Sequence, residues 1–448
     1  MTTIDEPDRG APPRGGVWKN TVLAGLANYI DGGSIVAGAA GLALWAAQFG
    51  LSSSFVGVIA AFSSNAISAG IGALVGGRLC DLFGRKRIYQ WDMLLYAFGV
   101  LWIVFATQPW MLVVGYVLAG LAVGADVPAS WTLIAESAPD RQRGRHSGVA
   151  QILWYLGPAV VLLLTLALSS LDVLGIRIVF AHLFVLALVL WALRRGMSES
   201  PRWRRAQHSA ARDSAAPPAP ERVGAAPNRL SLAALRPLLS RRNLGALLFL
   251  AGMYGIWNLF AGTNGFFLPY ILRTVGSQTQ AVSVALQCAI FVLSIIAIAF
   301  VFMPFVDRTN QKRMLGLAAA IQVVGVALFA VFPLTIVVAL GYVLLIGIGQ
   351  GMGQQSFFQL WSGELFPTLL RSTAQGLIFA VVRIALGLWS FFVPVLTASS
   401  GLHAVAWILT GFVLISGLIG WFFAPSNGGK SLEQIQRERQ ADTVPTTS

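Results

Sequence analysis

Runs of about 20 apolar residues recur along the whole of this chain, and each is long enough to cross a lipid bilayer as a helix. The bilayer core offers no water to backbone amides, so a chain crosses it only as helices or as a closed barrel. The runs are too long and too uniformly apolar for the alternating strands of a barrel. The sequence therefore predicts an all-α membrane protein.

We predict about twelve spans, with bounds good to a few residues. They are Thr21–Trp45, Phe55–Gly77, Ile88–Thr107, Trp110–Ile134, Ser147–Ala167, Val173–Leu193, Leu244–Ile271, Ala281–Met303, Met314–Val331, Leu334–Leu360, Thr373–Leu396 and Ala404–Ala424. Only 11% of the 448 residues are charged and 56% are hydrophobic, whereas a soluble domain has about 25% charged residues. The outer surface must therefore face lipid.

Arginine and lysine gather at alternate ends of these spans, for example at Lys19, at 85–87 and at Arg194, whereas the opposite loops around Gly50 and Gln108 contain almost none. This pattern is typical of cytoplasmic loops. We expect a multi-pass protein of the plasma or inner membrane with both termini in the cytoplasm. The same pattern explains the net charge of +13 without a nucleic-acid partner.

The composition changes abruptly to Arg, Ala, Pro and Ser between the sixth and seventh spans. We expect a cytoplasmic linker at 195–242 that joins two six-helix bundles, 21–194 and 243–424, with cytoplasmic tails at 1–20 and 425–448. The two halves echo each other, because similar charged loops follow the second and eighth spans and the fourth and tenth spans. An internal repeat with a central linker predicts alternating access, in which one bundle rocks against the other.

The charged loops also resemble those of a known family. The matching segments are Asp81–Arg87 (DLFGRKR), Glu136–Arg145, Glu199–Trp203 (ESPRW) and Pro425–Ile435. They are similar to the loop motifs of the major facilitator superfamily, and within it of the sugar porters. The residues at 124–128 (GADVP) and 262–264 (GTN) are similar to those of bacterial myo-inositol and polyol carriers. The resemblance implies a monomeric twelve-helix carrier in two bundles.

In the resembled family these loops form the inner gate. The residues that the resemblance assigns to the gate are Asp81, Gly84, Arg85, Glu136, Arg143, Arg145, Asp307, Glu364 and Arg371. We expect Asp81 or Glu136 to pair with Arg143 or Arg145 when the bundles meet on the cytoplasmic side, and to separate when they part. The alternative is that these charges only set the topology of the chain.

Two acids lie deep within predicted spans. Asp31 lies about 11 residues into the first span, roughly 16 Å from its end and near the bilayer midplane. Charge at that depth is costly, so it indicates function. We expect Asp31 to carry the coupled proton or contact substrate, or else to be a polar residue at a helix break. Asp126, at a similar depth, either shares the proton or supports the backbone freed by Pro128.

One cation and several amides also lie within the spans. Arg383, deep in the eleventh span, indicates either an anionic substrate or a counter-charge to Asp31 or Asp126. A polyhydroxylated ligand needs amides that both donate and accept, with aromatic faces beside them. The candidates are Gln151, Asn258, Asn264, Gln355, Gln359, Tyr29 and Trp257. The resemblance assigns sugar contact to Gln151 and Asn264, and interhelical hydrogen bonding is the alternative for the other amides.

The acids and histidines are dispersed, and the sequence has no nucleotide-binding loop, metal cluster or cofactor motif. We therefore expect a transporter driven by a gradient and not an enzyme. The first hypothesis is a proton-coupled importer of a neutral sugar or cyclic polyol, with myo-inositol the best guess. The alternatives are a carrier of a small organic anion, such as an aromatic acid, and a membrane nutrient sensor that binds ligand without moving it.

Overall fold

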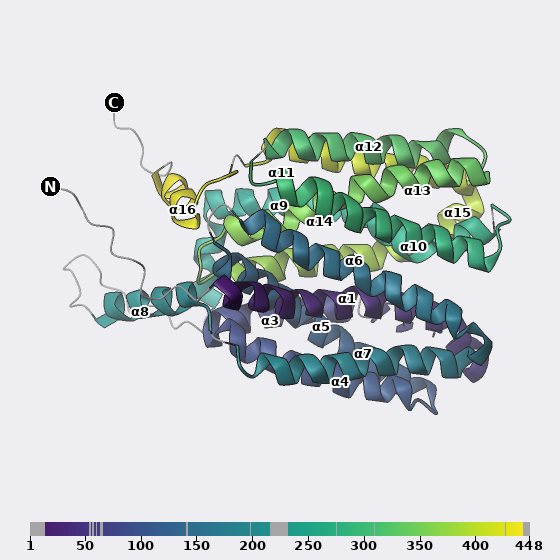
Figure 1. Cartoon of the computed structure of the whole chain (residues 1–448), viewed down its shortest axis with the longest axis horizontal. Coiled ribbons are helices and arrows are strands. Elements are labelled where there is room, and N and C mark those ends of the chain that lie inside the picture. The colour runs from purple at the N-terminus through teal and green to yellow at the C-terminus, as the bar shows by residue number, and fades with distance from the viewer. Residues whose placement is uncertain are drawn as a thin grey trace.

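The computed structural model describes residues 14–52, 55, 58–59, 61–62, 66–139, 142–197, 199–215, 232–274, 276–308, 310–425 and 427–441. All the regular elements within these residues are helices, and the long ones lie side by side along one axis (Figure 1). Part of each predicted tail and of the linker, namely 1–13, 216–231 and 442–448, lies outside the described residues.

The helices that precede the linker form the first half of the molecule. They are α1 (Arg14–Phe49), α3 (Ile67–Phe83), α4 (Arg85–Val104), α5 (Pro109–Ser137), α6 (Arg143–Ala167), the short η1 (Ser169–Leu171) and α7 (Asp172–Arg194). Each corresponds to one of the first six predicted spans, apart from η1, which is a connecting turn. The linker contributes α8 (Pro201–Ala215) and η2 (Leu232–Leu239).

The helices after the linker form the second half. They are α9 (Arg241–Thr274), α10 (Gln280–Ala297), the π-helical turn η3 (Ile298–Phe302), α11 (Met303–Phe305), α12 (Gln311–Val331), α13 (Ile336–Gly351), α14 (Gln354–Glu364), α15 (Arg371–Phe423) and α16 (Leu432–Ala441). The π-helical turn lies directly before Pro304, which has no amide hydrogen for a helical bond.

Glycines mark the interruptions within the second half. The predicted tenth span consists of α13 and α14, which are separated at Met352 and Gly353. The predicted eleventh and twelfth spans are both within α15, where Gly401 reverses the chain with φ 77°. A positive φ costs glycine little because it has no Cβ.

Nine described helical stretches have the length and hydropathy of membrane spans. The other three predicted spans are α1, α3 and α4, which are also helical. α3 has only 17 residues, and the predicted second span begins among residues that are not all described. α4 begins with three cations. The prediction of an all-α membrane protein is confirmed.

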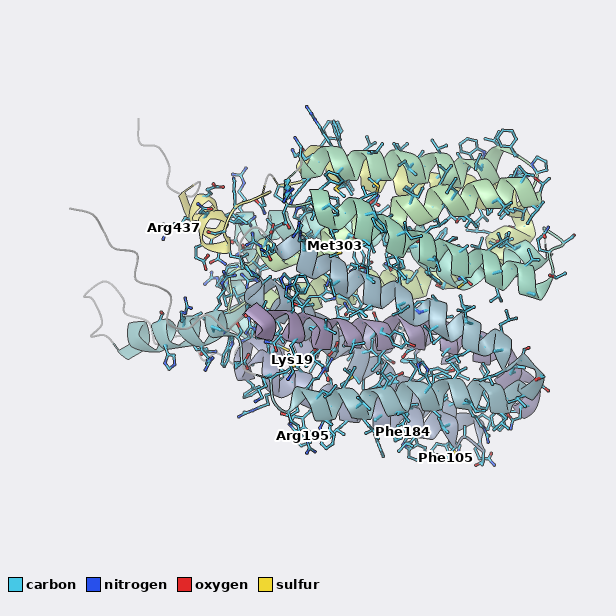
Figure 2. The ribbon with its side chains drawn as sticks, viewed as in Figure 1. Lys19, Phe105, Phe184, Arg195, Met303 and Arg437 are labelled. Atoms are coloured by element: carbon cyan, nitrogen blue, oxygen red, sulfur yellow. The ribbon has the colours of Figure 1, made fainter. Side chains whose placement is uncertain are left out.

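The two halves gather on opposite sides of the molecule, with α6 and α14 between them in this view (Figure 1). α1 begins at the end of the bundle where α8 and α16 also lie, which we call the terminal end. Lys19, Arg195 and Arg437 lie at this end, whereas Phe105 lies toward the other (Figure 2).

The halves approach most closely where α3 crosses α15. A Cβ on Gly77 would lie 2.3 Å from the carbonyl oxygen of Ser372, and one on Gly376 would lie 2.1 Å from that of Ala73. Only glycine permits backbones to pack this closely. The crossing therefore fixes the second helix of the first half against the fifth span of the second half.

Candidate functional site

A cavity of about 660 Å³, its mouth included, lies between the two halves. The first half contributes residues of α1 and α6, and the second half contributes residues of α9, α10, α13, α14 and α15. The lining residues are Gly32, Ile35, Val36, Trp154, Tyr155, Pro158, Tyr254, Trp257, Asn258, Ala261, Gly262, Asn264, Gly265, Phe291, Gln350, Gln355, Arg383 and Leu386.

Asp31 lies directly behind the wall that the first half contributes to this central cavity. The Trp154 side chain, which lines the cavity, donates its Nε1 hydrogen to Asp31 Oδ2 at 2.8 Å. Asp31 is 4% exposed, and its Oδ1 has no hydrogen-bond partner among the described residues. One face of the carboxylate is therefore fixed by the wall and the other remains available for a proton.

The second half contributes amides and aromatic faces to the cavity. Asn264 Oδ1 accepts a hydrogen bond of 2.7 Å from Tyr342, and Trp257 donates one of 2.8 Å to Gln322. Asn258 Oδ1 is buried and has no hydrogen-bond partner within the described part of the chain. The arrangement offers a ligand both positioned rings and an acceptor whose hydrogen bond is still to be made.

Arg383 brings a positive charge to the cavity from α15. Its Cζ lies 4.5 Å from the centroid of the Phe379 ring, and the guanidinium is close enough to Asp31 for the two to interact electrostatically. A carboxylate of the first half and a guanidinium of the second half thus attract each other across the boundary between the halves.

Three of the predicted ligand residues lie away from the lining of the cavity. Gln151 of α6 donates a hydrogen bond to Gln359 of α14, which joins the two halves. The Tyr29 hydroxyl lies 2.9 Å from His182 Nε2 within the first half. The contact of Gln359 matches the alternative of interhelical hydrogen bonding that the sequence analysis left open for it, and substrate contact by the three residues stays a prediction.

Asp126 belongs to a separate buried cluster in the first half. Arg194 Nη1 lies 3.1 Å from Asp126 Oδ1 and 3.2 Å from Asp92 Oδ1, and it also donates to the Tyr89 carbonyl at 2.9 Å. The side chains of Arg194, Asp92 and Asp126 are 0%, 1% and 4% exposed. Asp126 therefore has a cationic partner that the sequence analysis assigned only to a span end.

Charged residues tie the halves together at the terminal end. Glu136 of α5 accepts from Arg371 of α15 at 2.8 Å and from Arg85 of α4 at 3.0 Å. Arg85 also pairs with Asp81 at 3.1 Å. Because each of these side chains is at most 1% exposed, water screens the attraction little.

Asp81 also caps a helix of the opposite half. Its Oδ2 accepts the backbone amide and the hydroxyl of Thr373, both at 2.7 Å, in the first turn of α15. A carboxylate at a helix N-terminus satisfies amides that lack a partner within the helix and is favoured by the helix dipole. Separation of the halves at this end would break these bonds.

A second cluster repeats the arrangement with the halves exchanged. Glu364 of α14 accepts from Arg143 of α6 at 3.0 Å, as Glu136 does from Arg371. Asp307 Oδ1 accepts the Gly144 amide at 3.1 Å in the first turn of α6, as Asp81 does in α15. Burial raises the pKa of Asp307, against the opposing effect of this amide and of Arg143.

The remaining predicted gate residues, Arg145 and Gly84, lie beside the ion pairs that join the halves. Arg145 is exposed, and its backbone amide bonds Asp307. Gly84, with φ 98°, makes the turn between α3 and α4, and a Cβ there would lie 2.3 Å from Glu199 Oε2. Glu199 in turn accepts the amides of Arg85 and Lys86 at the start of α4.

The expected partners within the gate were wrong. Asp81 and Glu136 pair with Arg85 and Arg371, whereas Arg143 pairs with Glu364. The physical reason is that the two halves repeat each other. Each glutamate pairs with the arginine of the opposite half, Glu136 with Arg371 and Glu364 with Arg143. Sequence order alone places Glu136 beside Arg143.

Comparison with known proteins gives the family. The family model described as "Sugar (and other) transporter" matches residues 26–438. The minor myo-inositol transporter IolF of Bacillus subtilis is 45% identical over 421 residues, which cover 94% of this chain and 93% of that protein. The chain belongs to the sugar transporter family. It is therefore a membrane transporter and not an enzyme.

More distant relatives agree with the assignment of this chain to the sugar transporter family. The arabinose-proton symporter of B. subtilis is 25% identical, over 84% of this chain and 85% of that protein. A structure of the proton:xylose symporter XylE with 6-bromo-6-deoxy-D-glucose superposes with a TM-score of 0.77 at 19% identity, covering 95% of this chain and 99% of that one. The transporter thus has the predicted major facilitator fold.

Several residues that build the transporter's site escaped the sequence analysis. Trp154, Tyr155 and Tyr254 line the cavity, yet they look in sequence like ordinary apolar span residues. Gln322 supports Trp257 and the break before α14 from outside the cavity. Asp92 was missed because it follows the cationic start of α4 and looks like a residue at the end of a span. Its four-residue spacing to Tyr96, which puts both side chains on one face of the helix, was a usable signal.

Proposed function

We propose that this transporter takes up a small, neutral, polyhydroxylated ring together with a proton, and that myo-inositol is its first candidate substrate. The observation that carries the proposal is a cavity between the halves that combines amides and aromatic faces with an acid behind its wall. Similarity to the myo-inositol transporter IolF and to an arabinose-proton symporter supports both the substrate class and the coupling ion.

The charge balance of the cavity favours a neutral substrate over an organic anion. Arg383 is the feature that would bind a carboxylate. It interacts electrostatically with Asp31, so the protein supplies its own counter-charge. An anionic substrate would have to compete with Asp31 for the guanidinium, whereas a polyol needs only hydrogen bonds.

The transport cycle follows from the arrangement of the two halves. We propose bundles at 21–194 and 243–424 that rock about the cavity, with each monomer containing a complete site. We propose that the protein lies in the cell membrane with its terminal end, and with it both termini, on the cytoplasmic side. The cations Lys19, Arg195 and Arg437 at that end support this orientation. The gate clusters hold the halves together at that end in this structure.

Ligand binding to the purified transporter tests the substrate class. Trp154 and Trp257 line the cavity, so their fluorescence reports occupation by myo-inositol, pentoses, hexoses or aromatic acids. We expect a polyol to bind, and Asn258→Ala to weaken it by about tenfold, the effect of one lost hydrogen bond. Asn243→Ala, at the start of α9 and outside the lining of the cavity, is the matched control. Binding of carboxylates alone would overturn the proposal.

A further inference from the structure

The buried cluster of Asp92, Asp126 and Arg194 has an odd number of charges. Two carboxylates meet one guanidinium nitrogen in the interior of the first half. An arginine keeps its charge even when buried. With both acids ionised the cluster would have one uncompensated negative charge, and a single proton shared by the two carboxylates balances it. Asp92 Oδ2 has no hydrogen-bond partner among the described residues.

A pair of hydroxyl groups lies one helical turn from Asp92 on α4 and one helical turn from Asp31 on α1. Tyr96 lies one turn after Asp92 on α4, and its hydroxyl is 2.5 Å from Ser34 Oγ on α1. Ser34 in turn lies one turn after Asp31, on the same face of α1. Tyr96 is fully buried and close enough to Asp31 to interact with it electrostatically. The Ser34 hydroxyl also donates to the Ile30 carbonyl at 2.6 Å, so it must turn from that oxygen toward Tyr96 to pass a proton on.

We propose that the Asp92–Asp126 pair is the site from which the coupled proton leaves, and that Tyr96 and Ser34 carry the proton to it from Asp31. This inference rests on the proposed proton-coupled function. The protonated Asp31 gives its proton to a hydroxyl oxygen of the bridge while the bridge gives its own hydroxyl proton to the pair. Asp31 becomes a carboxylate, and the pair, which has released its shared proton toward the terminal end, regains one proton.

The surroundings of both sites are consistent with this step. Asp31 is faced by Arg383 of α15, Asp126 of α5 and Tyr254 of α9, and Trp154 of α6 bonds it. On α7, His182 bonds Tyr29. The pair is faced by Arg194 of α7, Tyr89 of α4 and Cys80 of α3. Arg383 favours the ionised Asp31 that remains after transfer.

The position of the pair gives the route its direction. Asp92 lies seven residues after the start of α4, about 10 Å along the helix from the terminal end. Arg194 is the last residue of α7 at that same end. A proton that moves from Asp31 to the pair therefore approaches the face that we assign to the cytoplasm, as uptake requires.

The test separates proton release from substrate movement in proteoliposomes that contain the full-length transporter. Exchange of labelled for unlabelled myo-inositol needs no net proton movement, whereas uptake driven by a pH gradient does. Tyr96→Phe removes the hydroxyl and keeps the ring. We expect exchange within about twofold of wild type and gradient-driven uptake reduced by about tenfold or more, as for the loss of a positioned proton-transfer group.

Thr410→Val is the control, since Thr410 is buried in the second half, where its hydroxyl donates to the Ala406 carbonyl. We expect it to leave both rates unchanged. Asp92→Asn keeps Asp126 to balance Arg194 and should reproduce the selective loss. Equal losses of exchange and driven uptake in Asp92→Asn, or wild-type driven uptake in Tyr96→Phe, would overturn the route. A wild type that neither exchanges nor accumulates inositol would refute the proposed function itself, and the route with it.

Discussion

The two carboxylate oxygens of Asp31 differ in their surroundings, because one accepts a hydrogen bond from a described residue and the other does not. Trp154 holds Oδ2 at 2.8 Å, while Oδ1 has no hydrogen-bond partner in the described residues. The indole lines the cavity, so a substrate that moves it also changes the surroundings of the acid. We therefore expect occupation of the cavity and protonation of Asp31 to affect each other through this one hydrogen bond.

Asp31→Asn tests the role of that acid. An asparagine has the same shape but cannot release a proton, so we expect uptake driven by a pH gradient to fall to the level reached without a gradient. Exchange of labelled for unlabelled substrate should remain. Asp31→Glu, which keeps a titratable group, should retain part of the driven uptake. Full gradient-driven accumulation by Asp31→Asn would contradict the assignment.

Arg383→Gln tests the charge of the substrate. If Arg383 serves as the counter-charge of Asp31, its loss leaves polyol binding in place and makes Asp31 hold its proton more tightly. We therefore expect the pH profile of uptake to extend to higher pH. Arg383→Lys keeps the charge and should retain the wild-type profile. Loss of binding of every carboxylate, with no polyol binding in the wild type, would identify an anion carrier instead.

At the terminal end, carboxylates of one half accept hydrogen bonds from helix N-termini of the other half. Asp81 of α3 caps α15, and Asp307, beyond α11, caps α6, so each half supplies the carboxylate for a helix of the other. Beside each cap, a cross-half pair of glutamate and arginine adds a direct ion pair. The helices α3, α5, α6, α14 and α15 are thus held together by contacts that exist only while the halves meet.

Asp81→Asn tests the cap of α15. An amide accepts the Thr373 hydrogen bonds less strongly and lacks the charge that the helix dipole favours. We expect the equilibrium to shift toward opening at the terminal end by roughly 5-fold to 150-fold, the range of ordinary conformational coupling. The labelling rate of Thr132→Cys, in a background without Cys80 and Cys288, measures this opening, because Thr132 is buried between the halves.

Asp172→Asn provides the control for that measurement, since Asp172 is an exposed acid at the first position of α7. It should leave the labelling rate of Thr132→Cys unchanged. Equal rates in Asp81→Asn and wild type would show that the cap does not hold the gate closed.

The spans could be predicted from sequence because lipid imposes one requirement on every residue that faces it. Side-chain partners could not, because they depend on which face of each helix meets which neighbour. Arg194 illustrates the limit: it is at a span end in the sequence, but its long side chain reaches inward to Asp92 and Asp126. Asp31, Asn258 and Arg383 were found because polar groups deep in a span stand out against apolar neighbours.

At the scale of the whole molecule, two related halves enclose one central cavity and are joined at one end. The cavity takes its acid from α1 and its amides from α9, α13 and α14. Because the ligand-binding groups are divided between the halves, neither half alone forms the site. Rocking of the halves would expose the same site to either side in turn.

The most direct test of this account is the uptake of labelled myo-inositol into proteoliposomes under an inward proton gradient. The account predicts accumulation above the external concentration, and collapse of that accumulation when a proton ionophore removes the gradient. Accumulation that is the same with and without the ionophore, or entry of organic acids but not of any polyol or sugar, would contradict it.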